Sequence, residues 1–486
     1  MTSLAQLAPH ALWSFFARIC AIPHPSKHEA ALSQWIQEWA INEGLTVKVD
    51  QVGNLIIRKP ATTGMEDRKG VILQAHIDMV PQANAATRHD FTKDPIEPYV
   101  DGEWVRAKGT TLGADNGIGA AACLAVLADK SLSHGPLEVL LTVDEEAGMG
   151  GAFGLEAGWL EGEILLNTDS EQDGEVYMGC AGGINANISF PIERLATDQS
   201  SKAFTLAIKG LRGGHSGVNI HQERGNANKL LCRLLYGVQQ HVALQLAHIE
   251  GGNLRNAIPR EASALITIAT GDTDRLHAQV KLLAQELQQE LKEVDSGLDI
   301  QLMEAALPET VLTPQTRQRL LSALLACPNG VIRMNQAIPG VVETSTNLGI
   351  ITTEESAIRI QCLVRSLNQT GRTYVEQMLA SLFTLAGAEC HFDGAYPGWA
   401  PDPASPIMQL LRQTHQRLFG HEPKIMVIHA GLECGLFKSA YPDWDMVSFG
   451  PTIQGAHSPD ERVHIPAVEN FWQLLCELLT VVPKKA

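Results

Sequence analysis

The stretch "PLEVLLTVDEE", residues 136–146, joins an almost continuous apolar run to three consecutive acids. Such a run is typical of a strand that is buried on both faces of a sheet. The carboxylates of Asp144, Glu145 and Glu146 repel one another, which costs free energy unless a positive charge lies beside them. The stretch therefore predicts a buried strand that ends next to a bound cation.

Two similar strands flank this stretch in the sequence. "GVILQAHID" (70–78) and "EILLNTD" (163–169) are apolar runs that end in polar side chains, and "NGIGAAACLAVLAD" (116–129) has the small residues of a closely packed helix. Strands that alternate with helices predict an α/β fold with a doubly wound sheet flanked by helices. In such sheets the carboxyl ends of the strands border the binding crevice.

The middle of the chain has a different pattern. Residues 202–305 follow the order strand, helix, strand, strand, helix, strand, and a weaker second set covers 313–393. This βαββαβ order is that of a ferredoxin-like unit. We therefore predict an inserted α+β domain over 188–395, and a discontinuous first domain made of 1–187 and 396–486.

The composition excludes several classes of protein. The chain has 486 residues, of which 45% are hydrophobic and 19% are charged, as expected for a folded protein of two domains. Its 54 acidic and 37 basic residues give a net charge of −17, which disfavours nucleic acid and anionic membranes as partners. The beginning of the chain lacks the pattern of a signal peptide. Nine scattered cysteines without a CxxC pair favour reduced thiols and a cytoplasmic location.

Potential metal ligands follow several of the predicted strands. A single histidine or acid at a strand end is usually an ordinary polar residue, and an acidic turn can simply be solvated. The set is more specific, because two histidines and several carboxylates that meet at one sheet edge suit zinc or a similar divalent ion. It consists of His76, Asp78, Asp115, Glu145, Glu146, Asp169 and His457.

Five ligands are more than one zinc ion uses while it keeps an open position, and they suit two ions that share a carboxylate. Consecutive residues at a strand end project differently, so Glu145 and Glu146 can have different roles. One can bind metal, while the other stays beside the attacking water as general base. Two ions would offset the carboxylate repulsion and lower the pKa of the water, as zinc does to roughly 7 in known sites.

The motifs, taken as a series, resemble a known family. "AHIDMVP", "GTTLGADNGIG", "DEEAGMGGAFG", "LLNTDSE", "GGHSGVNIH" and "AHSPDERV" are similar to the motifs of the co-catalytic zinc peptidases, the family of acetylornithine deacetylase, succinyl-diaminopimelate desuccinylase and carnosinase. "MGCAGG", "GVVETSTNLG", "AYPGW" and "HAGLECGLF" resemble its branch of bacterial aminoacyl-histidine dipeptidases. Ala75 and Glu433 stand where many relatives have Gly and Asp, and both favour that branch over the deacylases.

The resemblance implies a set of metal ligands. His76 and Asp169 would bind one ion, and Glu146 and His457 would bind the other. Asp115 would bridge the two ions. The resemblance also implies that the peptide bond after Asp115 is cis.

Five further residues receive roles from the resemblance. Glu145 would be the general base, and Asp78 would support the nearby metal-binding histidine. In the inserted domain, which would act as a lid, His215 would polarise the scissile carbonyl. Asn256 and Arg365 would hold the free carboxylate of the substrate, a task that suits arginine because its guanidinium binds carboxylates in a bidentate way.

The implied activity is that of a metal-dependent dipeptidase. It would hydrolyse unblocked dipeptides, preferentially Xaa-His and including β-alanyl-histidine (carnosine), with two divalent ions per subunit, zinc first and cobalt or manganese as alternatives. The resemblance also implies a homodimer in which His215 acts across the interface. Two other functions stay open. One is a metal-dependent amidohydrolase of N-acyl amino acids, and the other is a non-catalytic binding protein, against which the retained Glu145 argues.

Overall fold

The computed structural model describes residues 4–485. Contacts between Cα atoms group the chain into two units, and each is described by itself. The first contains Met1–Gly179, Pro401–Val427 and Leu432–Ala486, and the second contains Cys180–Ala400 and Ile428–Gly431. The sequence does not predict that residues 428–431 belong to the second unit. The domain boundaries of 187/188 and 395/396 remain a prediction.

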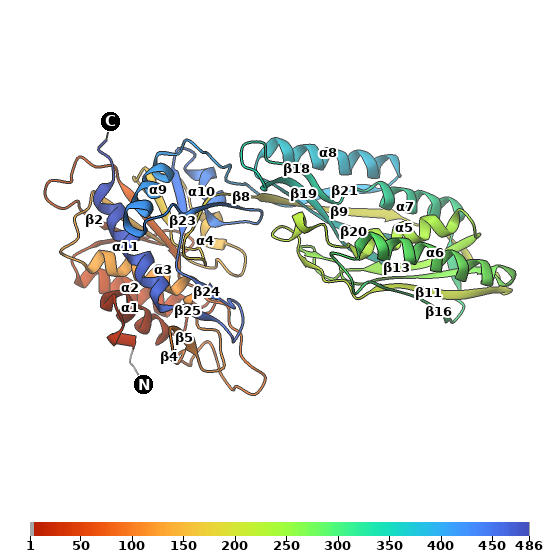
Figure 1. Cartoon of the computed structure of the whole chain (residues 1–486), viewed down its shortest axis with the longest axis horizontal. Helices are drawn as coiled ribbons and strands as arrows, with labels where there is room; N and C mark the ends of the chain where they lie inside the picture. Colours follow the sequence, from red (N-terminus) through yellow and green to blue (C-terminus); the bar gives the residue numbers. More distant parts are fainter. Residues whose placement is uncertain (1–3, 486) are drawn as a thin grey trace. The chain divides into compact units, whose positions relative to one another are not determined.

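The first unit is built on an eight-stranded mixed sheet (Figure 1). Its central strands β6, β3, β7 and β23 are parallel to one another, and the strands next to them, β2 and β8, are antiparallel. In sheet order the strands are β1 (Thr46–Val49), β2 (Leu55–Lys59), β6 (Leu137–Thr142), β3 (Val71–His76), β7 (Ile164–Asn167), β23 (Asp445–Phe449), β8 (Glu175–Cys180) and β22 (Lys424–Ile428).

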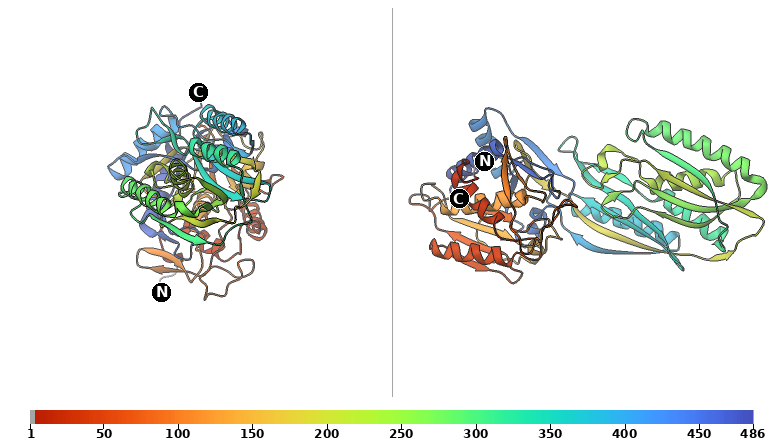
Figure 2. Two further views of the ribbon diagram at one scale, coloured as in Figure 1. Left: turned by 90° about the vertical axis from the view of Figure 1, so that its right-hand side faces the viewer. Right: turned by 90° about the horizontal axis from the view of Figure 1, so that it is seen from below.

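Both faces of this sheet are covered. Every residue of β3 and β6 is buried, and because successive side chains of a strand point to opposite faces, neither face is open at the centre. This confirms the predicted α/β architecture (Figures 1 and 2). The helices of the unit are α1 (His10–Cys20), α2 (Ala30–Asn42), α3 (Ala114–Ala128), α4 (Gly150–Gly154), α9 (Pro406–Phe419), α10 (Glu433–Ala440) and α11 (Ile465–Val481), with a short 3-10 helix, η1 (Leu4–Gln6).

The small residues of α3 allow it to pack closely. A Cβ atom on Gly117 would lie 3.1 Å from the ring of Phe16 in α1, and one on Gly119 would collide with the hydroxyl of Thr168. Larger residues at these two positions would push the helix away from its neighbours. The peptide bond between Asp115 and Asn116 is cis, as the resemblance implied, and the regular helix begins after these two residues.

A second sheet of the first unit has four short strands. Their order is β24 (Ile453–Gln454), β25 (Arg462–His464), β5 (Trp104–Ala107) and β4 (Pro98–Asp101). The turn between β24 and β25 carries His457, which has a φ of 64°. The sequence pattern predicts that His457 follows the strand that is now β23. The pattern does not reveal β24 before His457 or β25 after it, because two or three residues are too few to show a period.

The second unit is built on a nine-stranded antiparallel sheet. In order its strands are β16 (Asp299–Ala305), β11 (Ser201–Lys209), β15 (Ala262–Ala269), β13 (Leu244–Gly251), β19 (Val342–Thr353), β20 (Ala357–Ser366), β9 (Gly182–Pro191) and β21 (Glu389–Tyr396), and β18 (Gly330–Met334) pairs with β19. Two small sheets join β10 (Arg194–Ala196) to β17 (Thr310–Leu312) and β12 (Gly214–His215) to β14 (Ala257–Ile258).

Helices cover one face of this sheet (Figures 1 and 2). They are α5 (Ala227–Gln239), α6 (Thr273–Leu291), α7 (Pro314–Ala326) and α8 (Gln369–Leu385), and 3-10 helices η2 (Ile220–Gln222) and η3 (Thr270–Asp272) lie in the loops. Their apolar sides and the strands below form one continuous core, which includes Phe190, Phe204 and Phe383.

The second unit contains two ferredoxin-like halves, as predicted. The first is β11-α5-β13-β15-α6-β16, with its strands in the order β16-β11-β15-β13. The second half takes α7, β19, β20, α8 and β21 from 313–396, but its first strand is β9, which precedes the whole first half in the chain. The second pattern was weak in the sequence because this strand lies far from the rest.

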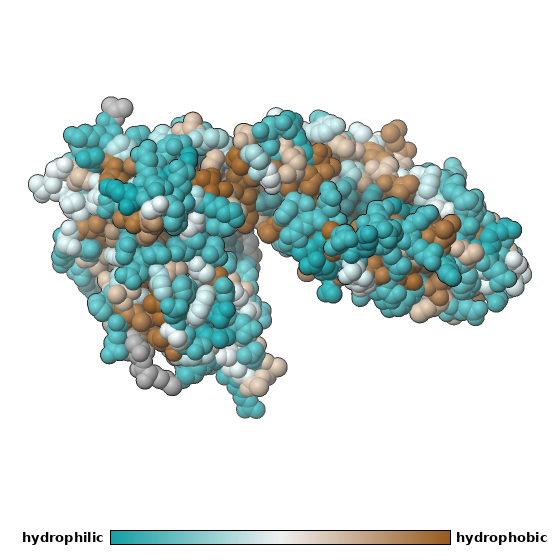
Figure 3. Space-filling view, viewed as in Figure 1, coloured by the Kyte–Doolittle hydropathy of each residue, from teal (hydrophilic) through white to brown (hydrophobic). Residues whose placement is uncertain are grey.

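The face in Figure 3 is mostly hydrophilic on both units, with apolar residues scattered among polar ones. None of the helices that the structure describes has the length and apolar character needed to cross a membrane. None of the nine cysteines, all of which belong to the described residues, forms a disulfide.

Candidate metal and catalytic site

Five predicted ligands meet at the carboxyl edge of the parallel strands in the first unit. The strands β6, β3 and β7 are neighbours in the sheet, so the segments that follow them lie side by side. The five residues are His76 at the end of β3, Asp115 at the start of α3, Glu146 after β6, Asp169 after β7, and His457 between β24 and β25.

Asp115 lies between the two histidines. Its Oδ1 is 3.2 Å from His76 Nε2, and its Oδ2 is 3.3 Å from His457 Nε2. Each histidine also faces a second carboxylate. His76 Nε2 lies 3.4 Å from Asp169 Oδ1, and His457 Nε2 lies 3.0 Å from Glu146 Oε2. The five side chains therefore form two nitrogen-carboxylate groups that share one carboxylate.

This donor set fits divalent cations. Ligand atoms of His76, Asp115 and Glu146 all lie within 4.8 Å of one another. Glu146 Oε1 is buried and has no hydrogen-bond partner among the described residues, so one carboxylate oxygen is left available. Imidazole nitrogen together with carboxylate oxygen is a donor combination that zinc and similar ions accept.

The pKa values express the excess of negative charge. Burial lowers the pKa of His76, but Asp169 and Asp115 together raise it well above its usual value. Hydrogen bonds to Asp115 and Glu146 raise the pKa of His457 to about 11. Burial raises the pKa of Asp169 and of Glu146, with the charge of Asp115 adding to it. A site that pulls protons onto its histidines in this way also attracts metal cations.

Asp78 connects the two strand ends. Its Oδ1 accepts a hydrogen bond from the Glu145 N–H at 2.9 Å, and its Oδ2 accepts from the Glu146 N–H at 3.1 Å and from the Ser26 hydroxyl at 2.7 Å. His76 Nδ1 lies 3.3 Å from Oδ1 and 3.1 Å from the Asp78 carbonyl oxygen. These acceptors favour a proton on Nδ1, which leaves Nε2 of His76 as a ligand atom.

Glu145 lies in the turn after β6, next to this cluster. Burial raises its pKa well above the usual value, and the charges of Asp169, Glu433 and Glu146 add to the effect while His76 opposes it. Its backbone carbonyl accepts from the N–H of Gly148 and Met149, which fixes the turn. A partly buried carboxylate beside the cluster is in the position that a general base would occupy.

Sequence reasoning missed a buried polar network beside the cluster. Glu433 is 1% exposed, and its Oε2 accepts hydrogen bonds from Gln74 at 2.7 Å and Thr142 at 2.9 Å. Burial raises the pKa of Glu433 to about 7. Gln74 lies two residues before His76, and a polar residue inside an apolar strand was a signal that could have been used.

His215 lies in β12 of the second unit. Its Nδ1 accepts hydrogen bonds from the N–H of Gly217 at 3.1 Å and of Val218 at 3.0 Å. Because Nδ1 accepts these bonds, a neutral ring has its N–H at Nε2, which can donate a hydrogen bond. Burial and the charge of Arg365 lower the pKa of His215 to about 4, so the ring is neutral at pH 7.

Arg365, in β20, is 4% exposed and lies beside His215. Its Nη1 donates to the Tyr396 hydroxyl at 3.0 Å, its Nη2 lies 3.4 Å from His215 Nε2, and its Nε has no acceptor among the described residues. His429, in which Nε2 lies 2.8 Å from the Ser345 hydroxyl, belongs to the same unit. Burial and Arg365 lower the pKa of His429 to about 3. Arg365 therefore has an N–H group available to donate a hydrogen bond to an anion.

Asn256 is exposed in the loop before β14. Its carbonyl accepts from the Ser216 N–H at 2.8 Å, next to His215 in the chain. Asn347 donates to the carbonyls of Arg255 and Ala257 on either side of it, at 3.0 and 2.8 Å. The structure therefore holds the backbone at Asn256 and leaves its side chain free to meet a ligand.

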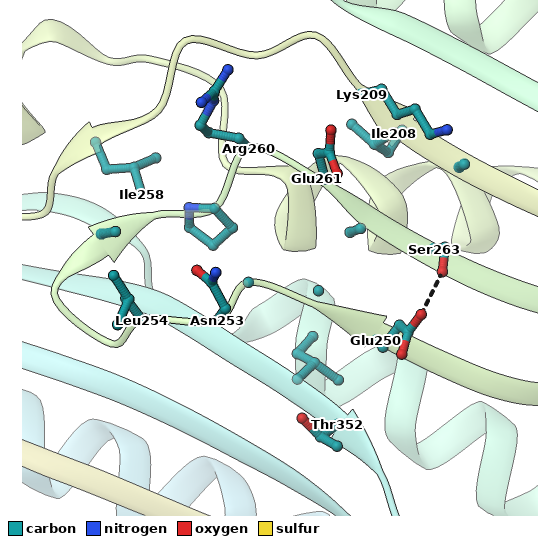
Figure 4. Close-up of a pocket in the computed structure, with 17 residues that line it drawn as sticks. Ile208, Lys209, Glu250, Asn253, Leu254, Ile258, Arg260, Glu261, Ser263 and Thr352 are labelled. Atoms are coloured by element: carbon teal, nitrogen blue, oxygen red, sulfur yellow. Dashed lines mark hydrogen bonds between the residues drawn. The ribbon is translucent and has the colours of Figure 1, made fainter. Parts of the chain in front are cut away.

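A cavity of about 640 Å³ lies elsewhere in the second unit, against β11, β13 and β15 (Figure 4). Charges of both signs line it, among them Lys209, Glu250 and Arg260, and the Ser263 hydroxyl donates to Glu250 at 3.3 Å. None of the predicted site residues lines this cavity.

Comparison with known proteins agrees with the geometry. The model of peptidase family M20/M25/M40 matches residues 72–481. A cytosol non-specific dipeptidase of Escherichia coli (strain K12) is 56% identical over 485 residues, which are 100% of both chains. The crystal structure of an aminoacylhistidine dipeptidase from Vibrio alginolyticus has a TM-score of 0.95 and 56% identity, and the match covers 100% of this chain and 99% of that one.

More distant structures share only the fold. Aminopeptidase PepT from Bacillus cereus has a TM-score of 0.57 and 14% identity, over 98% of this chain and 99% of that one. The family model and the full-length relatives together show that this chain belongs to peptidase family M20/M25/M40.

Proposed function

We propose that the protein is a metal-dependent dipeptidase that hydrolyses unblocked dipeptides, preferentially Xaa-His and including β-alanyl-histidine. The observation that carries this proposal is the position of Asp115 between His76 and His457, with Glu145 on the adjoining turn. The names of two relatives that are 56% identical over their whole length support it, since both are dipeptidases and one is named for aminoacyl-histidine.

The cofactor in this proposal is a pair of divalent ions. His76 and Asp169 would hold one, Glu146 and His457 the other, and Asp115 both. Ions of this kind polarise a carbonyl group and lower the pKa of water. Zinc is the first candidate, and cobalt and manganese accept the same donors.

The remaining groups act on protons and on the substrate. Glu145 takes a proton from the attacking water and passes it to the leaving amine. Asp78 holds the proton of His76 on Nδ1, so that Nε2 would face the metal ion. In the second unit, His215 donates a hydrogen bond from its Nε2–H to the scissile carbonyl oxygen and polarises it, while Arg365 and Asn256 bind the free carboxylate of the dipeptide.

The proposal includes a homodimer in the cytoplasm. The name of the Escherichia coli relative, a cytosol dipeptidase, supports the location. The dimer rests on the resemblance of the motifs to a family in which the matching histidine is often supplied by the neighbouring subunit. His215 of one subunit would therefore serve the metal site of the other.

A substrate panel tests the function. The protein loaded with Zn²⁺ is offered Ala-His, β-Ala-His, Ala-Ala and N-acetyl-histidine, and kcat/KM is measured for each. We expect turnover of all three free dipeptides, fastest for those with histidine, and little for the blocked compound. Faster hydrolysis of N-acetyl-histidine would favour an amidohydrolase, and no turnover with full metal would favour a binding protein.

A further inference from the structure

Glu461 is a buried carboxylate of the first unit, 2% exposed, directly before β25. Its side chain accepts four backbone hydrogen bonds from the loop 112–115. Oε2 accepts from the N–H of Leu112 at 2.7 Å and of Gly113 at 3.0 Å. Oε1 accepts from the N–H of Ala114 at 2.8 Å and of Asp115 at 3.2 Å. Four bonds fill the acceptor positions of a carboxylate.

The loop needs an acceptor from outside. The N–H groups of 112–115 precede the regular part of α3, which begins after Asn116, so they need acceptors from outside the helix, and Gly113 has no side chain that could supply one. Glu461 comes from a segment almost 350 positions later in the chain, and its negative charge suits the positive end of the helix dipole.

The backbone of Glu461 closes the turn that carries His457. Its N–H donates to the Ser458 carbonyl at 3.0 Å, and the Ser458 N–H donates to the Gly455 carbonyl at 3.1 Å. The neighbouring side chain of Arg462 bonds instead to Gln454, at 2.7 and 3.2 Å. One residue therefore connects the loop of Asp115 with the turn of His457.

We infer that Glu461 is a positioning residue of the metal site. It holds the loop of Asp115 against the turn of His457, so that the Asp115 carboxylate faces both histidines. This rests on the proposed function, since it takes Asp115 and His457 as metal ligands. A purely structural role would cost stability and leave metal affinity unchanged, so the two roles give different results.

The test is Glu461→Gln. An amide offers one acceptor oxygen, and its NH₂ group would face two N–H donors of the loop. We expect the dissociation constant for Co²⁺, measured against a competing chelator, to rise about 10–100-fold, as for other residues that orient metal ligands. The visible absorption spectrum of the Co²⁺ form should change as well. Asp115→Ala gives the reference for loss of a ligand itself.

Glu138→Gln is the matched control. Glu138 is 6% exposed and accepts from the N–H of Glu161 and Gly162 at 2.8 Å each, near the amino end of β6 and far along the strand from Glu145. This variant should lose stability and keep wild-type Co²⁺ affinity. If Glu461→Gln binds Co²⁺ as tightly as Glu138→Gln, with an unchanged spectrum, the inference is overturned.

Two further measurements keep the test decisive. Glu461→Asp, which is shorter by one methylene, should fold and show a smaller loss of Co²⁺ affinity. In the wild type, hydrogen exchange at the amides 112–115 should slow when Co²⁺ binds, and unchanged exchange would contradict the inference. Failure of the proposed function would appear separately, as absence of dipeptide turnover in a wild type with full Co²⁺.

Discussion

Glu145 and Glu146 are adjacent carboxylates in different surroundings. Asp78 accepts the backbone N–H of each, so the direction of the turn is fixed for both. Burial and neighbouring carboxylates raise the pKa of both, but Glu146 lies 3.0 Å from His457, whose hydrogen bond opposes the rise, whereas the pKa of Glu145 is raised well above its usual value. Two side chains of the same chemistry can thus have two roles, because their environments differ.

Glu145→Gln should keep the metal ions and lose activity. The amide cannot accept the proton of water, and general base catalysis typically contributes ~10²–10⁴-fold to the rate. Bound metal, by elemental analysis, and kcat are measured on the same sample. Glu146→Gln is the control, because it should lose metal. Near-normal kcat in a fully loaded Glu145→Gln would remove Glu145 from its role.

His429, which is buried in the second unit, should stay neutral in mild acid. Burial and Arg365 lower the pKa of His429 to about 3, whereas an unfolded chain takes up this proton near pH 6.5. Between those pH values the unfolded state binds more protons, so the contribution of His429 to stability decreases as pH falls. NMR of ¹⁵N-labelled histidine, with His429→Gln to identify the signal, should show no titration from pH 8 to pH 5. A midpoint near pH 6.5 would contradict the buried environment.

At the scale of elements, the start of α3 determines the position of Asp115 in the candidate metal site. Close packing at Gly117 and Gly119 fixes the helix, and the helix in turn fixes Asp115, whose two oxygens face different histidines. The turn between β24 and β25 places His457 beside one oxygen of this carboxylate only.

Asp115→Ala should therefore weaken both metal sites, while His457→Ala should mainly weaken one. Titration with Zn²⁺ monitored by calorimetry, together with elemental analysis, gives the number of ions and their affinities. We expect about two ions per wild-type chain. A fully active wild type with one tightly held ion, and no gain on adding more, would count against a shared carboxylate.

Features that depend on residues close together in the chain could be predicted from the sequence. The apolar runs of β3, β6 and β7 and the acids after them are local patterns, so these strands and the cluster of charged side chains could be predicted. The four bonds of Glu461 to the loop of Asp115, and the contact of Glu433 with Gln74, join residues more than 340 positions apart. Nothing in a single sequence indicates such partners, even when Glu461 stands inside a recognised motif.

At the scale of the whole molecule, the predicted catalytic groups divide between two units. The five predicted ligands and Glu145 belong to the first, and His215, Asn256 and Arg365 belong to the second. Reacting groups must come within about 3–3.5 Å of each other. If His215 acts as proposed, substrate turnover requires a second unit, from the same subunit or from its partner, to present it.

Mixing two inactive variants distinguishes these possibilities. Glu145→Gln and His215→Ala are combined, and subunits are allowed to exchange. If His215 serves the partner's site, one of the two sites in each mixed dimer has both Glu145 and His215 intact. Each mixed dimer should then have up to half of the activity of a wild-type dimer. Native mass spectrometry of differently labelled subunits checks the exchange. Confirmed exchange without any activity would mean that His215 serves its own subunit or has no catalytic role.

During translation, β9 is synthesised long before the strands with which it pairs. It pairs with β20 and β21, and residues 192–356, including the whole first ferredoxin-like half, are synthesised before β20. At ribosomal speeds of ~5–20 residues per second this delay is on the order of ten seconds. During that time the apolar side chains of Ile184, Ile188 and Phe190, all buried in the finished protein, have no sheet to join. A nascent chain in this state exposes an apolar, unpaired strand that is prone to aggregation. Slower translation between β9 and β20 should therefore increase the dependence of folding on chaperones.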